Sequence, residues 1–197
     1  MKQEQVHELL HEALETELGG VQIYEAALRC ARNDELRTEW EKYHDETTRH
    51  CEIVRGVFEV FGLDPEAETP GRLVVRHIGE SLVAAMDIAL SSGPPEAAEL
   101  VATECVTLAE TKDHLNWELL GEVAGNLTGD RATALMNACK EVEDQEDEHL
   151  YHTTGWSREL WMDSLGLPAV LPPPEEQKHV KTAIGASRAR QQRDDMT

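Results

Sequence analysis

Two stretches of this chain repeat the same spacing of acidic and aromatic residues. Each reads glutamate, six intervening residues, an aromatic residue and a second glutamate, in residues 17–25 and again in residues 110–118. Both stretches lie in longer segments whose apolar residues recur three or four positions apart, which is the spacing of an amphipathic helix. The repeat therefore favours a fold made of two similar helical units, each of which carries one copy.

Helix-breaking residues divide the chain into the segments that would build these units. Alanine, leucine and glutamate dominate, and runs with alternating polarity are scarce, so we expect an all-α protein. The predicted helices span residues 4–32, 35–61, 73–90, 96–124 and 131–164. Short loops make the first two and the last two helices antiparallel hairpins, and a long crossover with the short middle helix joins them. The four long helices bury their apolar stripes best as an antiparallel four-helix bundle.

Residues 167–197 differ in composition from the rest of the chain. They hold five of the 18 basic residues, three consecutive prolines at 172–174 and few large apolar side chains. Such a segment buries too little apolar surface to fold by itself. We expect residues 1–166 to form the bundle, and residues 167–197 to be an extended or disordered tail or to lie strapped across a surface.

A strong excess of acidic residues excludes several classes of partner. Lysine and arginine total 18 against 39 aspartates and glutamates, which gives a formal charge of -21. This charge repels nucleic-acid phosphates and anionic lipids. No apolar run approaches the length of a membrane span, and the N-terminal MKQEQVHELL lacks the apolar centre of a signal peptide. We therefore expect a cytoplasmic protein that binds neither nucleic acid nor membrane.

The cysteines also limit the kind of site that the chain can form. They are far apart and form no CxxC pair: Cys30, Cys51, Cys105 and Cys139. This spacing argues against a zinc ribbon, a rubredoxin-type iron site and a disulfide scaffold. It is typical of small buried thiols in a reducing compartment.

Acidic and histidine residues gather on the second helix of each predicted hairpin, in residues 44–50 and 143–149. A helix turns about 100° per residue, which tells us which of these residues share a stripe with apolar neighbours. Glu46 falls at the edge of such a stripe. The residues that fall within one are Glu17, His50, Glu146 and His149.

The helix predicted for residues 96–124 has two faces that could be buried. One contains Leu108 and Leu115, and the other contains Glu110, His114 and Trp117. Periodicity alone does not choose between them.

The inward-facing residues supply the donor atoms that divalent metal ions need. A buried carboxylate is costly unless a positive charge meets it. Carboxylate oxygens with one imidazole per hairpin suit iron or manganese, and bridging carboxylates neutralise two such ions. The pattern predicts two divalent metal ions, with iron preferred and manganese as the alternative.

Several of these segments resemble a known superfamily. Residues 17–24, 45–52 (DETTRHCE) and 57–62 (VFEVFG) look like the ferritin-like superfamily, and are similar to its small stress-induced bacterial members. The resemblance covers about residues 4–164. It implies a ferritin-like bundle around a dinuclear metal site, in a protein that is often dimeric. The ligands that it implies are Glu17 and Glu110 singly, and the pairs Glu46/His50 and Glu146/His149.

The first of these pairs departs from the family pattern. Glu46 and His50 are separated by three residues rather than two, and Thr47 stands where a glutamate is usual. Residues four apart project about 40° from each other, so both can still reach one ion.

Other residues remain open as replacement ligands, namely His114, Glu148 and His152. Glu148 and His152 nevertheless lie well round the helix from its apolar stripe. We interpret one glutamate and four histidines as surface residues: His7, His11, Glu148, His152 and His179.

The complete set predicts a dimetal protein that reacts with dioxygen or hydrogen peroxide, in a ferroxidase-like or peroxidase-like reaction. Electrons would come from Fe(II) or from an external donor, and we expect a homodimer. The alternative is a metal-free helical stress or scaffold protein with a degenerate site, because glutamate-rich helices also produce Glu–His pairs by chance. Metal content distinguishes the two hypotheses.

Overall fold

The computed structural model describes residues 1–196, and all the regular elements within this range are helical. The long helices are α1 (Gln3–Cys30), α2 (Asp34–Phe61), α3 (Pro70–Ser92), α4 (Pro95–Gly125) and α5 (Asp130–Ser164). Two short helices, α6 (Pro174–Gln177) and α7 (Ala183–Gln191), and the 3-10 turn η1 (Arg193–Asp195) follow. The all-α prediction is confirmed, and the five predicted helices begin and end within a few residues of the observed ones.

The helix ends are fixed by local chemistry. The side chain of Asn33 accepts hydrogen bonds from the backbone N–H groups of Glu35 and Leu36 at the start of α2. Thr69 caps α3 in the same way, by accepting from the N–H of Arg72. Gly62 ends α2 with a φ of 71°, a left-handed conformation that glycine adopts without steric cost.

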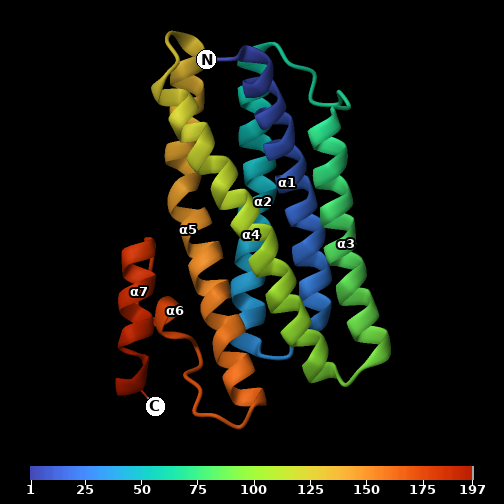
Figure 1. Ribbon diagram of the computed structural model, residues 1–197, viewed down its shortest axis with the longest axis vertical. Helices are drawn as coiled ribbons and strands as arrows, with labels where there is room; N and C mark the ends of the chain where they lie inside the picture. Colours follow the sequence, from blue (N-terminus) through green and yellow to red (C-terminus); the bar gives the residue numbers. More distant parts are fainter. Residues whose placement is uncertain (197) are drawn as a thin grey trace.

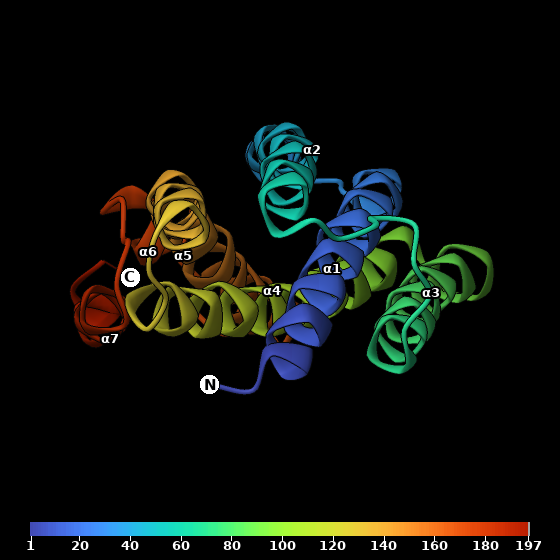
Figure 2. The same cartoon turned by 90° about the horizontal axis from the view of Figure 1, so that it is seen from above.

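Four of the long helices pack side by side, each against two of the others. α1 contacts α2 and α4, and α5 completes the ring by contacting α4 and α2. The crossover helix α3 packs against α1 and α4 on their outer side, away from α2 and α5 (Figure 2). The long crossover with its own helix, expected from the sequence, is therefore present.

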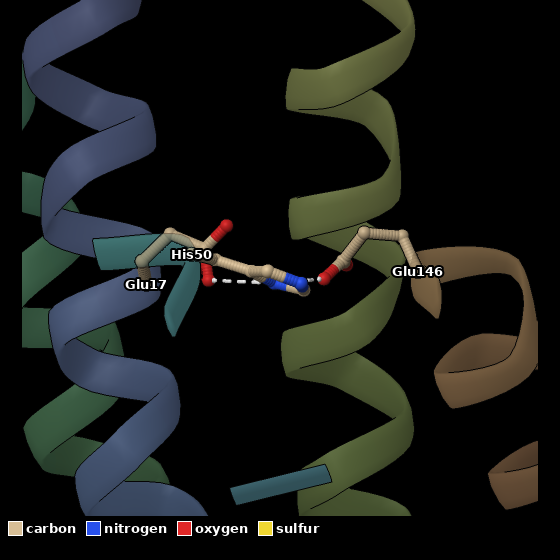
Figure 3. Close-up of side chains that lie close together, drawn as sticks. All are labelled: Glu17, His50 and Glu146. Atoms are coloured by element: carbon tan, nitrogen blue, oxygen red, sulfur yellow. Dashed lines mark ion pairs between the residues drawn. The ribbon is translucent and has the colours of Figure 1, made fainter. Parts of the chain in front are cut away.

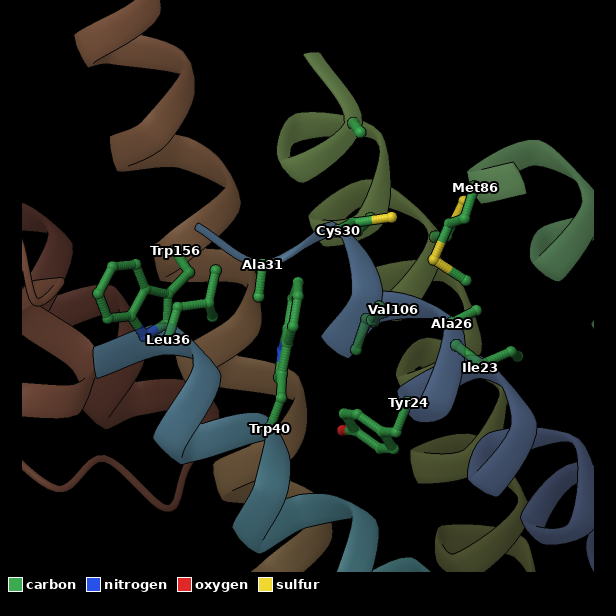
Figure 4. Close-up of a cluster of buried hydrophobic side chains, with 14 of the residues drawn as sticks. Ile23, Tyr24, Ala26, Cys30, Ala31, Leu36, Trp40, Met86, Val106 and Trp156 are labelled. Carbon is green, nitrogen blue, oxygen red and sulfur yellow. The ribbon is translucent and has the colours of Figure 1, made fainter. Parts of the chain in front are cut away.

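The core consists of two apolar clusters that are separated along the bundle by a polar belt. The first cluster contains Tyr24, Trp40 and Trp156 (Figure 4), and the second contains Leu14 and Phe58. Each of the four packed helices contributes residues to both clusters. On each helix a polar segment separates the residues of the first cluster from those of the second. The candidate ligands are all in this belt, with apolar side chains on both sides.

The structure decides which face of α4 is inward. Glu110 and Trp117 are buried, whereas Leu108 and Leu115 are exposed, together with Leu119 one turn later. The face that carries the carboxylate is the buried one because Tyr24 and other side chains of α1 provide its polar partners.

The tail is helical in part rather than extended or disordered, and it lies against α5, in agreement with the alternative expectation of a segment strapped across a surface. It carries α6, α7 and η1, and Figure 1 shows these helices beside α5. Ion pairs hold it there: Arg158 with Glu175 at 2.8 Å, and Arg193 with Glu159 at 2.8 Å. Gly155 allows the close approach, because a Cβ at this position would lie 2.7 Å from Glu175.

Two further expectations concern thiols and membranes. All four cysteines are free and buried, as predicted. Within residues 1–196, no helix has both the length and the apolar character that crossing a bilayer requires.

Candidate metal centre

Five of the six predicted ligands come together in the polar belt, in two groups of three. One group is Glu17, His50 and Glu146, and the other is Glu110, Glu146 and His149. In each group, one donor atom per residue lies within 4.8 Å of the donor atoms of the others. Glu146 belongs to both groups, so the arrangement has the form of two adjoining sites that share one carboxylate. All five side chains are buried.

The first group is centred on the Nδ1 atom of His50. This nitrogen lies 2.9 Å from Oε1 of Glu146 and 3.5 Å from Oε2 of Glu17. Figure 3 shows the two carboxylates approaching the imidazole from α1 and α5. The three residues come from three different helices, which fixes their relative positions through the packing of the bundle.

The second group is centred on the Nδ1 atom of His149. Oε2 of Glu110 and Oε1 of Glu146 each lie 3.6 Å from this nitrogen. The rings of His50 and His149 face each other, with centroids 5.9 Å apart and an angle of 26° between their planes. The two groups therefore lie next to each other across the shared Glu146.

Apart from the ion pairs between imidazole nitrogens and carboxylate oxygens described above, the atoms that face the centre of each group have no partner with hydrogen-bond geometry among the described residues. They are Oε2 of Glu17, Nδ1 of His50, Oε2 of Glu110, both carboxylate oxygens of Glu146, and Nδ1 of His149. Buried polar atoms are normally paired, so a cluster of unpaired ones needs an explanation. Carboxylate oxygens and imidazole nitrogens that converge in this way fit divalent iron or manganese.

The outer nitrogens of both histidines are bonded. Nε2 of His50 lies 2.8 Å from Oε1 of Gln145, and Nε2 of His149 lies 2.9 Å from Oε2 of Glu46. Contacts of this kind orient a histidine that binds metal and fix which nitrogen carries the proton.

Glu46 is the predicted ligand that the structure places elsewhere. Its carboxylate contacts the outer nitrogen of His149 and accepts from the side-chain amide of Gln145 at 3.3 Å, and it is in neither group of donors. Its position at the edge of the α2 stripe directs it past the centre, toward α5. Thr47, where a glutamate is usual, is buried against Gly20, whose added Cβ would lie 3.0 Å from the threonine methyl.

The repeated aromatic residues bond to the carboxylates crosswise. The indole N–H of Trp117 on α4 donates to Oε1 of Glu17 on α1 at 2.7 Å. The hydroxyl of Tyr24 on α1 donates to Oε1 of Glu110 on α4, also at 2.7 Å. Each copy of the repeat therefore supplies a carboxylate to one group and a hydrogen-bond donor to the other.

Charge in the belt is balanced by its two imidazoles. Burial alone would lower the pKa of His50, but the carboxylates of Glu146 and Glu17 raise it to about 11. Burial likewise opposes protonation of His149, but Glu110 and Glu46 raise its pKa to about 9. Burial also raises the pKa of the Glu110 carboxyl. Without a bound cation, both imidazoles are thus protonated at neutral pH.

One buried acid near the site was missed by the sequence analysis. Asp113 lies one turn after Glu110 on α4, is 5% exposed, and has an Oδ1 atom with no hydrogen-bond partner among the described residues. Burial, together with the charges of Glu17 and Glu146, raises its pKa well above the usual value. Its spacing of three residues from Glu110 places both on the same face of the helix, and this spacing is the signal in the sequence that could have identified Asp113.

The residues left open as replacement ligands lie outside both groups. His114 pairs with Asp147 at 3.3 Å, and Glu148 lies 2.7 Å from Lys42 and 2.9 Å from Lys181. His152 is 3% exposed, which contradicts the expectation of a surface residue.

The burial of His152 has a structural cause. Its Nδ1 accepts from the hydroxyl of Tyr43 at 2.9 Å, and its Nε2 lies 3.2 Å from the carbonyl of Val180 in the tail. His11, also expected on the surface, is 5% exposed and packs edge-on against Phe58.

Comparison of this chain with known protein families, with curated protein sequences and with solved structures gave no match.

Proposed function

We propose that this protein is a ferritin-like four-helix bundle that binds two divalent metal ions, iron in preference to manganese, and uses them in redox chemistry with dioxygen or hydrogen peroxide. One observation carries the proposal. The inner atoms of five buried side chains converge without hydrogen-bond geometry among the described residues, while the outer atoms of four of them, all but Glu146, are hydrogen-bonded. The two imidazoles make ion pairs with Glu17, Glu110 and Glu146, but these pairs lack hydrogen-bond geometry, and a bound cation would satisfy the converging atoms.

The chain's own residues divide into ligands and supports. Glu17 and His50 would hold one ion and Glu110 and His149 the other, with Glu146 shared between them. Iron held by these residues would supply one electron per ion, and the pair would supply the two electrons for reduction of dioxygen or peroxide.

The supporting residues hold the ligands in place. The hydrogen bonds from Trp117 and Tyr24 fix the two terminal carboxylates, and Gln145 and Glu46 fix the two imidazole rings. The apolar clusters on both sides of the belt limit the access of bulk water and strengthen these interactions.

Protons must leave when cations bind. Metal binding to nitrogen requires a neutral imidazole, and both histidines are protonated at neutral pH without a cation. We expect loading to release protons and apparent affinity to rise with pH.

The redox function can be tested by loading the protein with Fe(II) under anaerobic conditions and then adding hydrogen peroxide. The absorbance of the solution measures the oxidation of the bound Fe(II). We expect about one peroxide to be consumed for every two Fe(II) ions, faster than by the same iron free in buffer. Glu146→Ala should lose this acceleration, and Glu141→Ala, an exposed site on the same helix, should retain it. Oxidation at the rate of free iron by the wild-type protein would contradict the proposal.

A further inference from the structure

A cavity of about 350 Å³ lies between α4 and α5, beside the candidate metal centre. Its walls include exposed residues such as Glu118, Glu122 and Glu143, and also the side chain of Glu146, which is 1% exposed. One continuous space therefore extends from the protein surface to Glu146, the residue that both groups of donors share. Thr182 at the start of α7 contributes to the wall from the tail.

The lining is acidic from the exposed end to the buried one. Glu118 and Glu122 come from α4, and Glu143 and Asp147 come from α5. The side chain of His114, 3.3 Å from Asp147, adds a nitrogen donor to the wall. Clefts that are lined by charges of one sign concentrate ions of the opposite sign and raise their association rates.

Acidic side chains alone are common on a surface as negative as this one, and Glu146 gives the second observation. The Glu146 side chain contributes to the wall of the cavity, and its buried Oε2 atom has no hydrogen-bond partner among the described residues. A buried carboxylate oxygen without a hydrogen bond, on a residue that lines an acidic cavity, is a suitable acceptor for a cation that arrives through it.

We propose that the cavity between α4 and α5 is the route by which divalent cations reach Glu146 and leave it. The inference rests on the proposed function, because it assigns a path to the metal ions that the centre would bind. Cations would be drawn in by Glu118, Glu122 and Glu143, and would pass the His114–Asp147 pair before they meet Glu146.

Gly121 offers a way to close the route without changing a ligand. It lines the cavity, and a Cβ at this position would meet no atom within 4 Å. Gly121→Phe would therefore project a ring into open space, within a helix that tolerates a larger residue better than glycine. Gly56 on α2 has equally open surroundings and is not part of the cavity wall, so Gly56→Phe is the matched control.

The experiment measures Co(II) uptake by the full chain from the quenching of tryptophan fluorescence in stopped flow, and Co(II) release by competition with a chelator. Blocking a route slows uptake and release together and leaves the dissociation constant unchanged. We expect Gly121→Phe to slow both by about tenfold or more, and Gly56→Phe to match the wild type. Wild-type rates in folded Gly121→Phe would overturn the route.

Charge provides a second test that does not depend on the fit of the new ring. In the triple variant Glu118→Gln, Glu122→Gln, Glu143→Gln, we expect uptake at low salt to slow by about tenfold, and the difference to shrink as salt screens the field. The control neutralises three exposed acids away from the cavity, with the substitutions Glu41→Gln, Glu59→Gln and Glu80→Gln.

The outcomes separate the two proposals. Equal slowing by both triple variants would mean that total charge and not this cavity sets the rate, and would overturn the route while the metal centre stands. Failure of the wild-type protein to bind Co(II), Fe(II) or Mn(II) at all would overturn the proposed function, and the route with it.

Discussion

Trp117 and Glu17 lie on different helices, and the indole N–H of the first donates to Oε1 of the second at 2.7 Å. Tyr24 and Glu110 make the mirror contact at the same distance. The spacing of glutamate and aromatic residue in each repeat is two turns of helix, so that a carboxylate and a donor on one helix can face their counterparts on the other. The glutamate and the aromatic residue of each copy of the repeat thus form reciprocal hydrogen bonds with those of the other copy.

The first prediction is that Trp117→Phe weakens metal binding. A phenyl ring fills only part of the buried indole's space, and Oε1 of Glu17 loses its only described donor, so the carboxylate is no longer held toward the centre. Loss of a contact that orients a ligand lowers metal affinity by about 10–100-fold. A chelator competition with Mn(II) measures this change.

Trp161 provides the control for this substitution. Its indole N–H also donates to a glutamate, Glu104, but at an exposed site outside the belt. Trp161→Phe should leave the affinity unchanged. Equal affinities in all three proteins would show that the Trp117–Glu17 bond does not support the site.

The second prediction concerns the stability of the protein after chelation. The pKa of Asp113 is raised in the folded state, so the folded protein binds more protons than the unfolded chain above about pH 4. The free energy of unfolding therefore decreases as the pH rises, because the buried Asp113 carboxyl must ionise in the folded protein. We expect Asp113→Asn to increase the free energy of unfolding at pH 7 by roughly 1–3 kcal/mol, and by less at pH 5.

Urea unfolding of the chelated protein at both pH values tests this expectation. Asp163→Asn, at an exposed position near the end of α5, should change little. A loss of stability in Asp113→Asn at pH 7 would mean that the ionised carboxylate has a favourable partner in the fold.

The long helices and most of the inward-facing residues could be predicted because they depend on angular position around one helix. Glu17, His50, Glu146 and His149 share stripes with apolar residues, and all are buried. The role of Glu46 could not be predicted in this way. Its place at the edge of a stripe indicates the direction of the side chain but not the distance between α2 and α5. That distance determines that Glu46 contacts the outer nitrogen of His149.

Asp113 and the helices of the tail could not be predicted from the sequence for other reasons. Asp113 lies on α4, where two faces competed, and only the packing of α1 against α4 shows that it is buried. The composition of residues 167–197 favours disorder when they are considered alone. Glu159 and Arg158 on α5 provide ion-pair partners that such an argument does not include.

The third prediction is that acid loosens the contact between the tail and α5 through His152. Burial lowers the pKa of His152 to about 4, whereas the nearby carboxylate of Glu148 opposes the shift. Between pH 6.5 and 4 the unfolded chain binds this proton and the folded protein does not, so stability falls as the pH falls. The contribution lost between pH 7 and pH 5 is about 2 kcal/mol.

His152→Gln isolates this contribution. Glutamine can accept from Tyr43 and donate to the carbonyl of Val180 without titrating. The free energy of unfolding in urea, measured at pH 7 and pH 5, should fall by about 2 kcal/mol less in the variant than in the wild type. Identical pH dependence in the two proteins would contradict a buried neutral His152.

The most direct measurement is the metal content of the purified protein and its variants after anaerobic loading with Fe(II) or Mn(II) and removal of excess ions. We expect about two ions per chain in the wild type and in the control variant Glu141→Ala, about one in Glu17→Ala and in Glu110→Ala, and almost none in Glu146→Ala, because both groups of donors share Glu146. A wild-type chain that holds no metal, or a Glu146→Ala chain that still holds two ions, would contradict the shared dinuclear centre.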